Sequence, residues 1–182
     1  MQTNKQKSKS MILSSKNCQN QEKFGEICGD IRVQDQGYSI EKDDWFGFSQ
    51  ALGQRDYLNG RHQIRFRIEK LRRNGWMFFG IISKSESMNI NSFSCLSSYG
   101  WATQNRIYLA GECLQKDNDD IINNDIFILT IDCEQRKIQM KNQLTGHIDE
   151  ILVDINKCPF PWKLHFNLLN GCTSIRLLPT TT

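Results

Sequence analysis

Apolar and polar residues alternate along several short segments of the chain. The clearest segment lies at residues 62–71, where Ile64, Phe66 and Ile68 are separated by polar residues. Residues 162–168 repeat the pattern, and residues 138–140 show a shorter version. Successive side chains of a β-strand point to opposite faces, so a period of two predicts strands with one buried face and one face in water. In the second segment, Lys163, His165 and Asn167 are therefore expected on the wet face.

Two further segments, residues 76–82 and 126–131, are apolar on both sides. This pattern predicts strands in the middle of a sheet or under a second layer. Turn signals separate the segments at regular intervals, at Asn59-Gly60, Asn74-Gly75, residues 142–146, Cys158-Pro159 and Asn170-Gly171. No long helical pattern is present. The chain is therefore predicted to be an all-β protein built as an antiparallel β-sandwich.

Five motifs follow one another in a fixed order. They are Tyr-Leu-Asn-Gly-Arg-His at residues 57–62, Trp-Met-Phe-Phe-Gly-Ile-Ile-Ser at 76–83, Ser-Tyr-Gly-Trp at 98–101, the strand from Asn124-Asp125 to Asp132-Cys133, and Pro-Phe-Pro-Trp at 159–162 with Ser-Ile-Arg-Leu-Leu at 174–178. Each motif alone is weak, but the ordered set resembles the SPRY domain family over residues 24–178. The resemblance implies a bent two-sheet antiparallel sandwich with concanavalin-like jelly-roll layering. It also implies a protein-recognition module, as found in intracellular adaptors and ubiquitin-ligase receptors.

The start of the chain differs in composition from the remainder. Residues 1–22 are rich in Lys, Gln, Asn and Ser and carry few apolar residues, so they are predicted to form a disordered basic tail before a domain at residues 23–180. The net charge is +3, and the lysines among the first sixteen residues supply +4 of it, which leaves −1 for the rest. The domain thus lacks the positive field that binding to a phosphate backbone requires, and nucleic acid is not expected as a partner.

The cysteines and the apolar runs indicate where the protein is located. Seven cysteines are scattered as an odd set, and no Asn-x-Ser/Thr site exists, which favours a reducing compartment, the cytoplasm or also the nucleus. Near the start only Met11, Ile12 and Leu13 form an apolar patch, whereas a secretory signal needs about 7–15 apolar residues. Every apolar run is shorter than the roughly 20 residues of a membrane-spanning helix. Contact with a membrane is therefore not expected. As a separate expectation, the protein is predicted to be a monomer.

Candidate catalytic and metal-binding chemistry is sparse. No nucleophile elbow of Gly-x-Ser-x-Gly form is present, and His165 as a catalytic base is the less favoured alternative to a solvent-facing strand histidine. No two cysteines are closer than ten residues, so paired zinc ligands are missing. The acidic run at residues 117–120 is followed by Ile121 and Ile122 instead of a ligand and a glycine, which argues against a calcium loop. We expect no catalytic residue, metal or cofactor.

The loops of a sandwich gather at its ends, where a rigid scaffold presents them for binding. Four loops are predicted, at residues 43–57, 84–99, 111–124 and 167–172. They contain the aromatic, apolar and arginine residues typical of binding hot spots, although Trp45 and Phe48 are expected to plug the end of the sandwich. The fourth loop is included because, by the resemblance, it lies where some SPRY domains contact their peptide. The predicted partner-binding residues are Arg55, Tyr57, Met88, Phe93, Leu96, Tyr99, Leu169, Asn170 and Gly171.

These observations favour a non-catalytic module that binds a protein or peptide through loops, with a substrate-recognition role in ubiquitin signalling implied by the resemblance. The alternative is a carbohydrate-binding sandwich, because lectins share this layering. A basic cluster leaves a second question open, because its members form either a plain polar surface or a grip for the carboxylates of an acidic peptide. Its members are Arg61, Arg65, Arg67, Lys70, Arg72 and Arg73.

Overall fold

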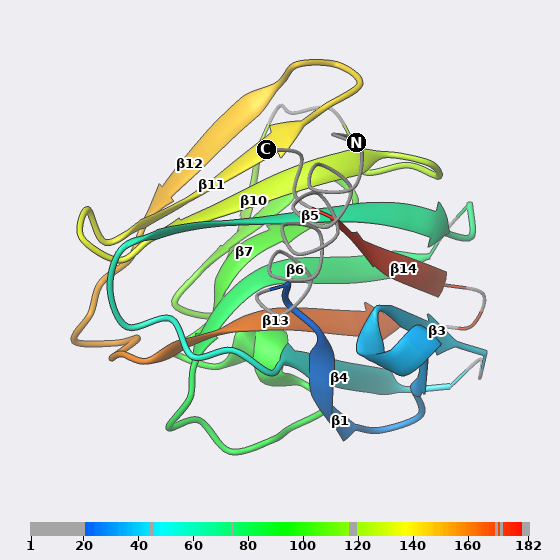
Figure 1. Ribbon diagram of the computed structural model, residues 1–182, viewed down its shortest axis with the longest axis horizontal. Helices are drawn as coiled ribbons and strands as arrows, with labels where there is room; N and C mark the ends of the chain where they lie inside the picture. Colours follow the sequence, from blue (N-terminus) through cyan, green and yellow to red (C-terminus); the bar gives the residue numbers. More distant parts are fainter. Residues whose placement is uncertain are drawn as a thin grey trace, which may run out of the picture.

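The computed structural model describes residues 21–43, 46–73, 75–116, 120–169, 171 and 173–179. These residues form strands and two short 3-10 helices, arranged as two layers (Figure 1). The elements are β1 (Phe24–Cys28), β2 (Arg32–Gln34), η1 (Asp35–Gly37), β3 (Ser39–Lys42), β4 (Phe48–Gly53), β5 (Arg61–Lys70), β6 (Trp76–Ser83), η2 (Ser92–Ser94), β7 (Tyr99–Ala102), β8 (Arg106–Leu109), β9 (Glu112–Gln115), β10 (Ile126–Asp132), β11 (Lys137–Asn142), β12 (Ile148–Leu152), β13 (Trp162–Leu169) and β14 (Thr173–Leu178).

Each layer is a seven-stranded antiparallel sheet. Sheet A has the order β1-β4-β13-β6-β7-β8-β9, and sheet B has the order β12-β11-β10-β5-β14-β3-β2. Both sheets combine strands that are distant in the sequence, since β13 lies between β4 and β6, and β5 lies between β10 and β14. The predicted all-β, two-sheet antiparallel sandwich is confirmed. No helix in the described parts of the chain is long and apolar enough to cross a membrane.

The alternation predicted for residues 62–71 sets the orientation of sheet B. Ile64, Phe66 and Ile68 of β5 are buried, with relative exposures of 4%, 0% and 0%, and they point toward sheet A. The facing residues of sheet A include Phe79 and Phe166, whose rings lie 4.9 and 5.2 Å from that of Phe66 in edge-on geometry. Such aromatic pairs add to the burial of apolar area in holding the two layers together.

Close contact between β6 and β7 depends on two glycines. Gly80 and Gly100 are paired directly across the two strands. A Cβ atom at Gly80 would collide with the carbonyl oxygen of Tyr99, and one at Gly100 with that of Phe79. Any side chain at either position would therefore force these strands apart.

The prediction that one face of residues 162–168 is exposed to solvent is wrong. Lys163, His165 and Asn167 are 5%, 0% and 0% exposed, although they alternate with core residues as expected. The loop of residues 84–98, which contains η2, lies over His165 and Asn167 and covers this outer face of sheet A. The period of two predicted the strand correctly, but it could not show that a loop covers the second face.

Two of the predicted loops contain strands. Residues 43–57 include β4, and residues 111–124 include β9. β4 is stabilised by pairing with β1 and β13, which are distant in the sequence. β9 is an edge strand with all of its residues exposed, so its sequence has no apolar alternation to detect. At the N-terminal boundary, Glu22 is 4% exposed and belongs to the folded part, whereas the predicted tail extended through residue 22. The rest of the predicted tail, up to residue 20, lies outside the described residues.

Candidate functional site

A second aromatic cluster lies outside the sandwich core, on the outer face of sheet A. Trp76 and Phe78 alternate along β6 with Met77 and Phe79, which face the core, so the first pair points away from sheet B. The cluster consists of the buried residues Trp76, Phe78, Ala102 and Tyr108, with the partly buried Phe48, Phe93 and Leu169 packed against them.

Strand register brings these residues together from distant parts of the sequence. Leu169 of β13 is paired with Phe48 of β4 on one side and with Trp76 of β6 on the other. Directly opposed residues point to the same face of a sheet, so these three side chains form a row. Tyr108 follows from β8, where its ring lies 6.3 Å from that of Trp76.

Phe93 of η2 completes the cluster from the loop above the sheet. Its ring centroid lies 4.7 Å from those of Phe48 and Trp76 and 5.6 Å from that of Tyr108. We call Phe48, Trp76, Phe93, Tyr108 and Leu169 the aromatic patch. The patch is formed by strands of a rigid sheet and by one loop, and its partly buried members leave it open to solvent.

The loop of residues 84–98 is held on the sheet by polar contacts, which are buried or partly buried. Ser92 Oγ lies 2.8 Å from both His165 Nε2 and Asn167 Oδ1. Asn167 Nδ2 donates to the carbonyl oxygen of Ile90 at 2.8 Å, and the backbone N–H of Asn89 donates to Gln50 Oε1 at 2.9 Å. Ser92, His165 and Asn167 are all 0% exposed. Buried polar groups with satisfied partners fix a segment in one arrangement, and we call this segment the anchored loop.

A serine, a histidine and an asparagine side by side raise the question of nucleophilic catalysis. The geometry does not favour it, because Ser92 Oγ donates to Asn167 and no part of the three side chains is exposed to a substrate. Burial lowers the pKa of His165 to about 3, so the ring stays neutral at physiological pH. The prediction of a solvent-facing His165 is wrong, since the anchored loop covers it. The side chain anchors the loop.

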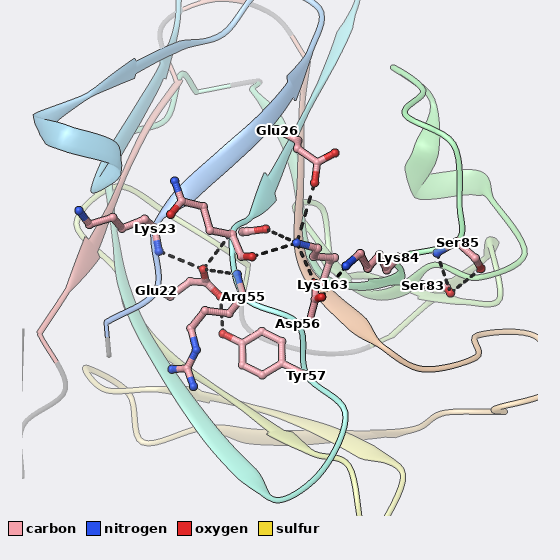
Figure 2. A network of polar contacts seen from close by, with 12 residues as sticks. Glu22, Lys23, Glu26, Arg55, Asp56, Tyr57, Ser83, Lys84, Ser85 and Lys163 are labelled. Atoms are coloured by element: carbon pink, nitrogen blue, oxygen red, sulfur yellow. Dashed lines mark hydrogen bonds and ion pairs between the residues drawn. The ribbon is translucent and has the colours of Figure 1, made fainter. Parts of the chain in front are cut away.

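A second polar network lies at the opposite end of β4 (Figure 2). Lys163 Nζ is nearly buried and lies 3.0 Å from Asp56 Oδ1, whose other oxygen lies 2.5 Å from Lys84 Nζ. Hydrogen bonds from Lys84 and Lys163 hold the pKa of Asp56 below its ordinary value. These contacts tie β13 to the segments that follow β4 and β6, and they reduce the cost of burying the amine of Lys163.

Next to this network, Glu22 binds the segment that follows β4. One oxygen of its carboxylate accepts from the Tyr57 hydroxyl, and the other accepts from the backbone N–H groups of Lys23, Gln54 and Arg55 at 2.9, 2.9 and 3.2 Å. Burial, together with the charge of Glu22, raises the pKa of Tyr57 above its ordinary value. Glu22 and Tyr57 are thus structural residues.

Six of the nine predicted site residues fall into three groups in the structure. Phe93 and Leu169 belong to the aromatic patch, and Met88 and the 59% exposed Leu96 lie on the anchored loop. Tyr57 and Tyr99 are only 1% and 3% exposed, so the prediction that they lie on the binding surface is wrong.

The remaining predicted residues do not join the patch. Gly171 is buried, and Asn170 lies outside the described residues. Arg55 lies at the other end of β4 from Phe48, with its guanidinium 5.6 Å from the ring of Tyr57. Trp45, also outside the described residues, was expected with Phe48 to plug the sandwich, whereas Phe48 lies in the patch outside the core.

Sequence reasoning also missed two members of the patch, Trp76 and Tyr108. Trp76 lies in β6, which was expected to be buried on both faces, and Tyr108 lies in β8, which was not predicted. The alternation of Trp76 and Phe78 with Met77 and Phe79 contained the signal, because two interleaved pairs of large apolar side chains require two separate apolar environments.

The cysteines and acidic residues that the structure describes do not form a metal cluster. The five cysteines described, Cys28, Cys95, Cys113, Cys133 and Cys158, are free. Burial raises the pKa of Cys133 to about 11 and that of Cys158 to about 12, opposite to the shift that a thiolate nucleophile needs. The described residues also contain no group of three or more His, Cys, Asp or Glu side chains placed to hold a metal ion.

The fold that these sheets define is the SPRY fold. The SPRY domain of human HERC1 is similar with a TM-score of 0.70 at 14% identity, covering 87% of this chain and 99% of that one. The TRIM65 PSpry domain is similar with a TM-score of 0.66 at 12% identity, covering 92% and 95%. Stonustoxin is similar with a TM-score of 0.61 at 10% identity over 86% of this chain and 27% of its own. No protein-family model and no curated protein sequence matches the chain.

Proposed function

We propose that this protein is a non-catalytic interaction module that binds a protein or peptide through the aromatic patch and the anchored loop. The observation that supports the proposal is the aromatic cluster outside the core, which includes the partly exposed Phe48, Phe93 and Leu169. An aromatic cluster of this kind on a rigid sheet is typical of the centre of a binding surface, where large side chains lose water together.

Exposed apolar side chains also lie on the anchored loop and just before β4. Leu96 and Ile90 of the anchored loop are 59% and 39% exposed, and Phe46, two residues before Phe48, is 83% exposed. Because the buried contacts of Ser92 and Asn167 already fix the loop, a ligand would not have to bear the entropic cost of ordering it.

The experiment compares two leucines of equal exposure. Leu96 lies on the anchored loop and is 59% exposed, while Leu58 follows Tyr57, which is paired with Trp162 at the end of β13 opposite Leu169, and is 58% exposed. Peptides are selected from a displayed random library on the wild-type domain, and their affinities are then measured on Leu96→Ser and Leu58→Ser. We expect roughly tenfold weaker binding with Leu96→Ser, which corresponds to about 1.4 kcal/mol, and no change with Leu58→Ser. Equal effects of the two substitutions would contradict the proposal.

The same variants test the carbohydrate alternative. A glycan array probed with the labelled domain is expected to give no binding that depends on Leu96. Glycan binding that is lost in Leu96→Ser and retained in Leu58→Ser would replace the peptide ligand with a sugar.

A substrate-recognition role in ubiquitin signalling is a further part of the proposal, and only the likeness to SPRY domains supports it. We also propose an intracellular location, which the free cysteines among the described residues support. Co-precipitation of ubiquitin-ligase subunits with the wild-type protein and with the Leu96→Ser variant tests the first point. Ligase subunits that are captured from cells equally by both proteins would bind elsewhere than at the patch.

A further inference from the structure

The outer face of sheet B, on the opposite side of the sandwich from the aromatic patch, has a regular pattern of side chains. One row of paired residues crosses five adjacent strands, from β14 through β5, β10 and β11 to β12. In that order its members are Leu178, Arg65, Ile128, Lys141 and Ile148. Apolar and cationic side chains thus alternate across a row of about 19 Å, given strand spacings of about 4.8 Å.

The acidic side chains around this row already have cationic partners. Glu69 pairs with Arg176 at 2.5 Å, Glu150 with Lys137 at 2.9 Å and Glu41 with Lys70 at 2.8 Å. The pKa of Glu150 lies below its ordinary value, chiefly because of its hydrogen bond to Lys137.

Three cations in or next to this row have no ion-pair partner among the described residues. They are Arg65, Arg67 and Lys141. Arg65 Nε donates to Gln143 Oε1 at 2.6 Å, an uncharged acceptor that leaves its positive charge uncompensated.

Apolar side chains lie between these cations. Ile126 is paired with Arg67, and Ile128 is paired with Arg65 on one side and Lys141 on the other. Both isoleucines are half-buried, and Ile148 at the end of the row is 51% exposed. The face therefore combines excess positive charge with apolar area that a partner could remove from water.

We propose that this face is a second binding surface, specific for an acidic polypeptide segment in which two carboxylates flank an apolar side chain. Arg65 and Lys141 would each bind one carboxylate, and the apolar side chain would lie on Ile128. In an extended segment, residues i, i+2 and i+4 point to one side and cover about 13 Å, which fits within the row. The guanidinium of Arg65 can bind a carboxylate through two parallel hydrogen bonds.

A peptide fits this face better than a nucleic acid does. Phosphate backbones require many cations, whereas three uncompensated cations here are interleaved with isoleucines that would have no apolar partner on a phosphate strand. The inference does not depend on the aromatic patch, which lies on the other sheet, so the domain would hold two ligands at once.

The test uses the isotopically labelled full chain and the peptide Ser-Glu-Ser-Leu-Ser-Glu-Ser. Backbone amide signals are followed by NMR during titration, and we expect shifts confined to β5, β10 and β11. Arg65→Gln with Lys141→Gln is expected to weaken binding about tenfold, since charge-assisted hydrogen bonds are lost. A control variant, Arg73→Gln with Lys157→Gln, removes the same charge at exposed sites away from the row. It is expected to bind normally.

Each peptide change has a defined outcome. Replacing both glutamates by glutamine, or the leucine by serine, is expected to weaken binding, and added salt is expected to weaken it as well. The inference is overturned if both double variants bind equally or if the glutamine peptide binds as well as the glutamate peptide. It is also overturned if single-stranded RNA shifts the same amides at lower concentration. Leu96→Ser should leave this binding intact, which separates the outcome from the fate of the proposed function.

Discussion

Replacing Ser92 by alanine tests whether the anchored loop is held by its buried polar contacts. The hydroxyl of Ser92 lies 2.8 Å from His165 Nε2 and 2.8 Å from Asn167 Oδ1, and all three residues are 0% exposed. The substitution removes one hydrogen-bonding group from a site that water does not reach. We therefore expect Ser92→Ala to destabilise the fold and to loosen the loop that carries Phe93.

The structure limits the size of the effect. His165 Nε2 and Asn167 Oδ1 also lie 2.8 Å from each other, so they keep one mutual contact when the hydroxyl is gone. The loss is then a buried hydrogen bond without a fully orphaned partner, which costs about 1–2 kcal/mol. For a domain of this size, each kcal/mol lowers the melting temperature by roughly 2–4 °C, so a decrease of about 2–8 °C follows.

Ser94 provides a matched control within the same 3-10 helix. It is exposed, and its hydroxyl donates to the carbonyl oxygen of Asn91 at 2.9 Å. Ser94→Ala is expected to change stability by less than about 0.5 kcal/mol. Urea unfolding and thermal melts of both variants give the comparison. Should Ser92→Ala and Ser94→Ala lose the same stability, the buried contacts do not hold the loop, and the reasoning is refuted.

Three further predictions concern two buried titratable residues and the contact between β6 and β7. The pKa of His165 is about 3 in the fold and about 6.5 in the unfolded chain, so between these pH values only the unfolded chain binds the extra proton. The free energy of unfolding should therefore fall as pH drops through this window, by at most about 1.4 kcal/mol per pH unit. His165→Gln should reduce that slope in urea titrations, and an unchanged slope would contradict the prediction. Gly80→Ala should lower the free energy of unfolding by about 3 kcal/mol, because the added methyl group would meet the β7 backbone. A melting temperature equal to that of the wild type would show that β6 and β7 can move apart at no cost in stability. Glu22→Ala should cost roughly 2–4 kcal/mol by leaving the Tyr57 hydroxyl and three backbone amides without their acceptor; a near-neutral effect in thermal melts would mean that water replaces the carboxylate.

The candidate site was predictable only in part. Phe93 and Leu96, which lie in or beside the proposed site, were predicted from aromatic and apolar residues in a predicted loop, whereas Leu169 was predicted from the resemblance to SPRY domains. Tyr99 was misplaced, since a tyrosine at a predicted loop end can equally begin a strand. In the fold it pairs with Ile81 and points into the core.

The sequence by itself determined the strands with a clear hydrophobic pattern, and the inward faces of those that alternate. Ile64, Phe66 and Ile68 could be assigned to the core because the period of two is a local property of an extended backbone, and a one-residue slip would put all three in water. The same local rule applies to residues 162–168, where it correctly separated Leu164, Phe166 and Leu168 from their neighbours.

Only the tertiary structure decided what happens on the outward faces. His165 and Asn167 are buried because a loop some seventy residues earlier in the chain lies over them. The aromatic patch likewise unites Phe48, Trp76 and Phe93, whose convergence depends on which strands become neighbours and on the path of one loop. Local alternation contains neither fact, because both result from the pairing of distant segments when the two sheets assemble.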